Sequence, residues 1–304
     1  MAPGAANEGL RNEALHAALN AALAGRPRAL EDLLARHGGY GARPNLRLAA
    51  AFGAEMAALS GVTAPLLEHL AANDAAPDTP QVFLPIAAAY GWVGRLRAGR
   101  EVGSAWDALA RLAGDERGPV RVGTLDALTA FATTRTGARA LLLHAGDWLE
   151  IEDREIRFGA AGVVIEVFGV RASLAALSDP EPLLAYLSRA IAEVADAPRA
   201  AERSDGRRRL LLALPRTLVA VAAAFSAGDR GPSWLEEEFR SARHPDVRTA
   251  LSNTLIALAD RASGEGSVMA QRLRAALEGS AKPPRDPTRI RPGAGRGRSS
   301  RPVR

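Results

Sequence analysis

A short signature recurs along the chain at a nearly constant interval. Each copy is a turn residue, an aliphatic residue and an Arg, followed by a stretch rich in Ala and Leu. The third position of successive copies recurs after 36, 36, 38 and 36 residues, and then after 51 and 40. The copies are Gly9-Leu10-Arg11, Asn45-Leu46-Arg47, the degenerate Gln81-Val82-Phe83, Pro119-Val120-Arg121, Glu155-Ile156-Arg157, the stretch at Arg208 and Arg209, and Asp246-Val247-Arg248. An interval of this length is typical of a chain built from stacked supersecondary units.

A second amphipathic stretch lies between successive signatures. Apolar residues recur in these stretches at helical spacing, as Trp106, Leu109, Ala110 and Ala113 do. The predicted helices are 27–37, 62–72, 102–113, 136–150, 180–195, 232–243 and 267–278. A short helical pair cannot bury its own apolar face, so neighbouring pairs must cover one another. The sequence therefore predicts an all-α fold of about seven helical hairpins.

The composition supports helices and excludes several kinds of site. Aromatic residues make up only 5% of the chain, and the cysteine count is 0, which excludes disulfides, thiolate zinc sites and cysteine nucleophiles. The histidines lack the spacing of a metal-binding helix, and no phosphate-binding glycine loop or nucleophile elbow occurs. The histidines are His16, His37, His69, His144 and His244. We expect no metal and no cofactor, and the sequence gives no positive evidence for enzymatic activity.

Positive charge is concentrated at the C-terminal end. The chain has a net charge of +5, but from Lys282 onward eight basic residues and one acid give +7, which leaves −2 for the rest. Lys282 is the only lysine, so the abundance of Arg looks like the codon bias of a high-GC genome. The prolines and glycines of residues 280–304 predict a disordered tail. The tail could attract a nucleic acid or an acidic protein through its arginines, which are Arg289, Arg291, Arg296, Arg298, Arg301 and Arg304. Alternatively, it could serve only to keep the protein soluble.

The long interval of 51 residues suggests a division of the array. We predict N-terminal repeats over residues 1–196, a charged insertion loop over 197–207, C-terminal repeats over 208–279 and the tail over 280–304. Charged residues interrupt the first two dozen positions, which argues against a signal peptide. Pro215 and Arg216 interrupt the most apolar run. We therefore expect a cytoplasmic protein with no membrane partner.

The interval and the aliphatic–Arg step resemble HEAT repeats across residues 8–279. The best match is Asp115 through Arg121, which looks like the turn inside a HEAT hairpin. The resemblance implies a right-handed α-α superhelix whose curved surface binds another protein. It also implies a structural ladder between repeats, formed here by Arg47, Asp115, Arg121, Arg157 and Arg248.

A second hypothesis comes from one group of HEAT-like proteins. Some DNA alkylation-repair glycosylases of this fold hold a damaged base with Trp, Asp and Arg, and this chain has Trp106, Asp107 and Arg157. However, Trp106 lies on the apolar stripe of its predicted helix, which favours a place in the core. A non-enzymatic scaffold that binds a partner protein remains the first hypothesis, and the glycosylase is the alternative.

Overall fold

The computed structural model describes residues 3–40, 44–262 and 268–278, and within these ranges the chain is helical and contains no strand. The all-α prediction is therefore confirmed for this part of the chain. The helices are α1 (Pro3–Leu23), α2 (Arg28–Gly38), α3 (Leu46–Ala58), α4 (Ala64–Ala71), α5 (Phe83–Arg97), α6 (Val102–Ala113), α7 (Gly118–Ala132), α8 (Arg135–Trp148), α9 (Arg154–Val167), α10 (Arg171–Ala175), α11 (Glu181–Ala195), α12 (Asp205–Ala224), α13 (Arg230–Ser241), α14 (Pro245–Arg261) and α15 (Val268–Glu278). Short 3-10 turns cover Pro80–Val82, Arg199–Arg203 and Ala227–Asp229.

The predicted helices agree with these bounds. All seven stretches expected between the signatures are helices, and each boundary lies within two residues of its predicted position. The signatures after the first fall at or near the starts of α3, α5, α7, α9, α12 and α14. The short α10 was not predicted. The segment 197–207, predicted as a loop, contains the 3-10 turn Arg199–Arg203 and the start of α12. The predicted tail, 280–304, lies outside the described residues.

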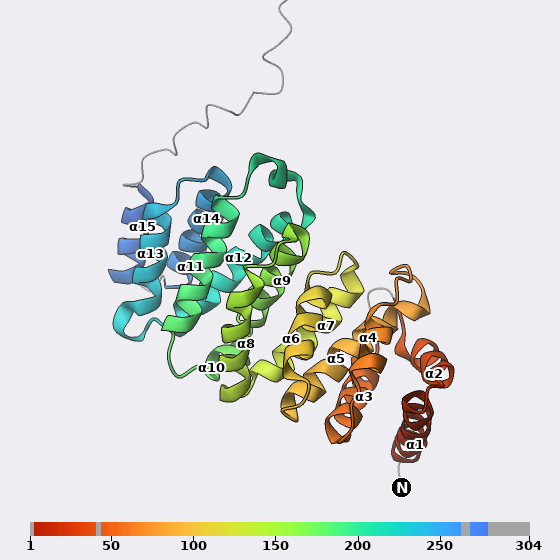
Figure 1. Ribbon diagram of the computed structural model, residues 1–304. Coiled ribbons are helices and arrows are strands. Elements are labelled where there is room, and N and C mark those ends of the chain that lie inside the picture. The colour runs from red at the N-terminus through yellow and green to blue at the C-terminus, as the bar shows by residue number, and fades with distance from the viewer. Residues whose placement is uncertain (1–2, 41–43, 263–267, 279–304) are drawn as a thin grey trace, which may run out of the picture.

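The helices follow one another in an elongated array, with α1 and α15 at opposite ends (Figure 1). The second helices of the pairs form a continuous row in which α3 packs on α5, α5 on α7, α7 on α9, α9 on α12, and α12 on α14. We call these six helices the second-helix row. The first helices α4, α6, α8 and α13 each pack on the row helix that follows them. No helix of the described ranges is both long and apolar enough to span a bilayer.

Helix α5 is buried on every side. All residues from Phe83 to Arg95 are buried, because α2, α3, α4, α6 and α7 all pack against this helix. Its contact with α3 is especially close at Gly53 and Gly94. A Cβ added at Gly53 would lie 2.6 Å from the Tyr90 carbonyl oxygen, and one added at Gly94 would overlap the Gly53 carbonyl. Only glycine allows the two backbones to approach this closely.

Arg95 joins two hairpins from within this core. Its side chain is almost fully buried, and the guanidinium donates hydrogen bonds to the carbonyls of Met56, Leu59 and Gly61 at distances of 3.1, 2.7 and 2.8 Å. These carbonyls lie at the C-terminal end of α3 and just beyond it, where helix carbonyls lack partners within the helix. The Nε atom of Arg95 also lies 2.6 Å from the Glu101 carboxylate.

Glu101 connects the same arginine to the start of α4. Its carboxylate accepts hydrogen bonds from the backbone amides of Thr63 and Ala64, at 2.9 and 2.8 Å, and from the Thr63 hydroxyl. Burial acts to raise the pKa of Glu101, but these hydrogen bonds and the bond from Arg95 together outweigh it and lower the pKa. The ion pair thus binds the end of one helix and the beginning of the next.

We predict that Gly94→Ala destabilises the protein, because the added methyl group meets backbone that cannot rotate away. Overpacking of this kind costs about 1–3 kcal/mol. Gly103→Ala on α6 is the matched control, since a Cβ there meets no atom within 4 Å. Urea unfolding should show a lower midpoint for Gly94→Ala and an unchanged or higher midpoint for Gly103→Ala. Equal midpoints for the two variants would show that α3 and α5 are not in close contact.

We predict that Glu101→Gln lowers the free energy of unfolding by about 3 kcal/mol at neutral pH, because it leaves Arg95 buried without its counter-ion. The pKa of Glu101 is lowered in the folded state, so its contribution is present above the ordinary value of 4.5 and is lost as the pH falls through the folded pKa. The difference from wild type should therefore shrink in acid. The exposed Glu68→Gln on α4 is the control, and unfolding midpoints measured across pH test the prediction.

Candidate functional site

An open groove lies over α7, α9 and α12. Its volume is about 820 Å³, and α3 contributes Leu46 at one edge. We call it the row groove, because every helix that lines it belongs to the second-helix row. Gly118, Gly159, Gly162 and Gly169 line part of it. At Gly159 and Gly169 an added Cβ would lie 2.9 Å from the Gly114 Cα and 2.7 Å from the Thr217 hydroxyl, so glycine allows close packing there.

Aliphatic side chains project from the walls of the row groove. Leu212 on α12 is 80% exposed, Val122 on α7 is 50% exposed, and Val170 beyond α9 is 40% exposed. No described helix covers them. Single exposed aliphatic residues are common on protein surfaces, but a group in one hollow is typical of a binding surface.

Three arginines stand among these aliphatic residues. Arg209 and Arg216 are seven residues apart on α12, which places them on one helix face with Leu212 between them. Arg121 lines the same groove from α7. The Nε atom of Arg209 is buried and has no hydrogen-bond partner in the described structure. Burial and the charge of Arg209 lower the pKa of the Arg121 guanidinium. Unsatisfied donors and like charges held close together would be stabilised by an anion.

Two carboxylates share the row groove with the arginines. Asp126 on α7 accepts a hydrogen bond from the Tyr90 hydroxyl, and burial, reinforced by Asp126, raises the pKa of that tyrosine. Glu166 on α9 is exposed to solvent, yet desolvation by the surrounding groove walls raises its pKa, and Arg216 and Arg121 offset this only in part. Three arginines and two acids give the lining a formal charge of +1.

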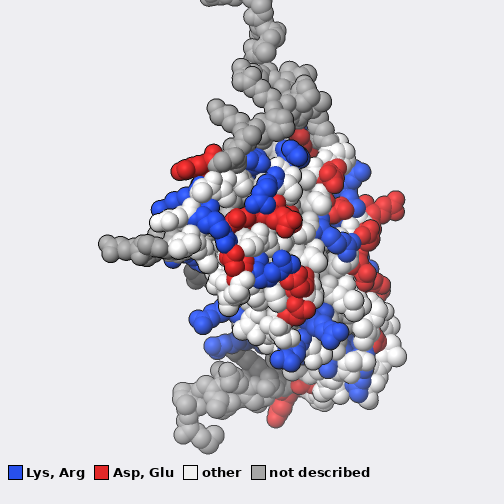
Figure 2. Space-filling model, turned by 90° about the vertical axis from the view of Figure 1, so that its left-hand side faces the viewer, with Lys and Arg blue, Asp and Glu red and all other residues white. Residues whose placement is uncertain are grey.

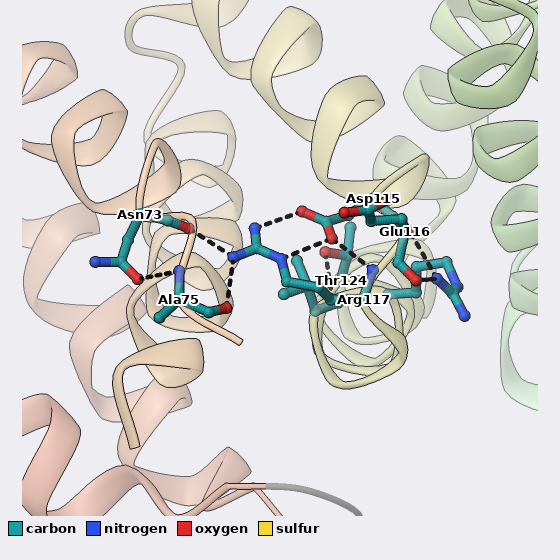
Figure 3. A network of polar contacts seen from close by, with 8 residues as sticks. Asn73, Ala75, Asp115, Glu116, Arg117 and Thr124 are labelled. Carbon is teal, nitrogen blue, oxygen red and sulfur yellow. Dashed lines mark hydrogen bonds and ion pairs between the residues drawn. The ribbon is translucent and has the colours of Figure 1, made fainter. Parts of the chain in front are cut away.

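A polar network fixes the start of α7 at the edge of the row groove (Figure 3). Arg117 forms a bidentate ion pair with Asp115, with N–O distances of 2.9 and 2.7 Å. The same guanidinium donates to the carbonyls of Asn73 and Ala75 at 2.6 and 3.2 Å, in the segment between α4 and α5. It therefore holds the start of α7 against the preceding hairpin.

Arg121 is oriented by the turn that precedes α7. Its Nη1 atom donates to the carbonyls of Asp115 and Glu116, both at 2.6 Å. These bonds use one nitrogen of the guanidinium. The side chain is thus held in place while it lines the row groove.

The residues predicted as a structural ladder are placed in different ways. Arg121 bonds within its own turn, as described, and the side chain that reaches the preceding hairpin from this turn is Arg117 rather than Arg121. Arg248 donates hydrogen bonds to the Phe239 and Ala242 carbonyls within its own hairpin. The Nε atom of Arg157 lies 3.7 Å from a carboxylate oxygen of Glu193. Arg47 is exposed on α3.

The residues of the glycosylase hypothesis do not line the row groove. Trp106 is 4% exposed, stacks on His144 with ring centroids 4.6 Å apart, and contacts Phe131 and Trp148 edge-on. The prediction that Trp106 belongs to the core is confirmed. Asp107 is exposed on α6, and Arg157 lies on α9 next to the Phe158 ring. No contact in the described structure brings the three together.

The end of the array carries charges of both signs. Figure 2 views the molecule from the side on which α13 and α15 lie in Figure 1, and arginines and carboxylates are interspersed there. Two ion pairs of this region are Arg230 with Glu181, at 2.5 Å, and Arg272 with Glu236, at 2.6 Å. This face therefore offers no surface of a single charge. The tail arginines Arg289, Arg291, Arg296, Arg298, Arg301 and Arg304 lie outside the described residues.

Among the described residues, no group of three or more His, Asp or Glu side chains could hold a metal ion. Comparisons of the chain with protein-family models, with curated proteins and with solved structures found no match. The function must therefore be argued from the row groove itself.

Sequence reasoning missed the groove residues. It treated Arg208 and Arg209 as a copy of the repeat signature, and Arg216 as an interruption of an apolar run. The available signal was the spacing of Arg209, Leu212 and Arg216, which puts two charges and an aliphatic residue on one helix face.

We predict that Glu166→Gln leaves the protein as stable as wild type, or more stable, at neutral pH. Because folding raises the pKa of Glu166, its ionised form disfavours the folded state, and this cost disappears as the pH falls below the ordinary value of 4.5. The exposed Asp107→Asn is the control. Thermal midpoints measured across pH should show the gain near neutrality only, whereas a lower midpoint for Glu166→Gln at neutral pH would contradict the raised pKa of this carboxylate.

Proposed function

We propose that this protein is a non-enzymatic scaffold that binds a partner protein through the row groove. In this proposal the array is a HEAT-like, right-handed α-α superhelix, and the second-helix row forms its curved binding surface. The stacking of α3, α5, α7, α9, α12 and α14 supports this view, because such a row presents a long continuous face. The observation that carries the proposal is the exposure of Leu212, Val122 and Val170 in one hollow.

The shape of the row groove favours a protein segment over a small molecule. Sites for small molecules usually enclose most of the ligand, and few side chains in them face open water. Here Leu212 is 80% exposed on the groove wall, so it cannot enclose a small ligand. A segment of another protein can lie across an open groove and cover such side chains along its length.

The lining is also unlike that of a nucleic-acid site. Proteins that bind nucleic acid neutralise many phosphates, and those that bind single strands stack bases on aromatic rings. The row groove has a formal charge of +1, and no aromatic residue lines it. The basic tail would add a general attraction for acidic partners, which is a separate part of the proposal.

We predict that Leu212→Asp weakens partner binding by at least about 10-fold, since it places a charge where the partner buries apolar surface. Leu143→Asp on α8 is the matched control, because Leu143 is 71% exposed and does not line the groove. Both changes are at exposed positions and should leave stability within about 0.5 kcal/mol of wild type.

The partner for this test can be found with a photo-crosslinking amino acid at position 212 or 143. Proteins crosslinked from position 212 alone are then purified and titrated against wild type and both variants by calorimetry. Equal affinity of the purified partner for wild type and Leu212→Asp would contradict the proposal. So would a crosslinking pattern that is the same from both positions.

A further inference from the structure

Charged and aliphatic groups alternate along the α12 wall of the row groove. Leu212 lies three residues after Arg209 and four residues before Arg216, so the three side chains follow one another on a single face. Arg121 and Val122 supply a second arginine–aliphatic combination from α7. A ligand that covers the aliphatic side chains must therefore also satisfy the arginines beside them.

Resting on the function proposed above, we infer that the row groove recognises a partner segment in which Asp or Glu alternates with aliphatic residues. Carboxylates of the segment pair with Arg121, Arg209 and Arg216, while its aliphatic side chains cover Leu212 and Val122. Arginine matches this task because its planar guanidinium donates two parallel hydrogen bonds to a carboxylate.

The carboxylates already in the groove explain why a more highly charged ligand fits less well. Glu166 and Asp126 bring the lining to +1, so a phosphate group with nearly two negative charges would meet strong repulsion from Glu166. Single negative charges spaced along a peptide can instead approach each arginine separately. The chain's own tail is basic and is repelled by the same arginines.

The charge balance makes opposite predictions for two kinds of substitution. The double variant Arg209→Gln, Arg216→Gln removes two donors and two positive charges, and should weaken binding of an acidic peptide by at least about 10-fold. Glu166→Gln removes a repelling charge, and should tighten binding by about 3-fold. Arg111→Gln with Arg139→Gln is the charge-matched control, because both arginines are exposed on first helices and do not line the groove.

The experiment begins with selection of peptides from a random displayed library on the full-length wild-type protein. We expect the selected peptides to be rich in Asp, Glu and aliphatic residues. One of them is then synthesised in three forms, which are the acidic peptide, its Asn/Gln analogue and a phosphoserine analogue. Fluorescence anisotropy against wild type and each variant, with a short DNA duplex as a further probe, gives the affinities.

Four results would overturn the inference. First, the selection could yield no enriched peptides, or peptides without acidic residues. Second, the amide analogue could bind as tightly as the acidic peptide. Third, the phosphoserine analogue or the DNA could bind more tightly than the acidic peptide through the same arginines. An unchanged affinity of the acidic peptide for the Arg209, Arg216 double variant would also overturn it.

Failure of this inference can be separated from failure of the proposed function. If the purified natural partner loses affinity for Leu212→Asp but binds the arginine double variant as it binds wild type, the groove binds a protein that is not acidic. If neither substitution alters the affinity of that partner, the scaffold proposal itself fails.

Discussion

The fold depends on the mutual covering of neighbouring helices, because no hairpin of this chain can bury its own apolar surface. Helix α5 shows this most clearly, since its residues from Phe83 to Arg95 are all buried and five other helices pack against it. Burial of one aliphatic side chain contributes about 1.5–3 kcal/mol, so a helix of this kind holds its neighbours firmly in place. The array is stable as a whole because each pair completes the one before it.

The row groove arises from the same arrangement. The first helices α4, α6, α8 and α13 pack on the second-helix row, and the short α10 packs on α7 and α12. The groove over α7, α9 and α12 is nevertheless open, and it leaves Leu212, Val122 and Val170 exposed. Aliphatic residues of the row that would be covered in a compact protein are left in contact with water there. The bonds from Arg121 to the Asp115 and Glu116 carbonyls fix that side chain in the groove, so a partner meets at least this guanidinium already oriented.

The sequence was a good guide to the helices and a poor guide to the site. Helix positions follow from apolar spacing and turn residues, which are local properties, and the bounds of the seven first helices were therefore predicted closely. Arg95 and Arg117 were missed because their partners are carbonyls 34 to 44 residues away, and no local pattern marks such a contact. The groove was missed because it requires α7, α9 and α12 to be placed side by side, which spacing within a single helix cannot show.

The joints made by Arg95 and Arg117 have a consequence for how this chain can change. Both guanidiniums bind main-chain oxygens of the preceding hairpin, at Met56, Leu59 and Gly61 in one case and at Asn73 and Ala75 in the other. Every amino acid offers that oxygen, so mutations in these turns can accumulate without loosening the joint, as long as the backbone keeps its path. Two such arrays could thus keep the same architecture after the sequences of their turns have diverged beyond recognisable similarity.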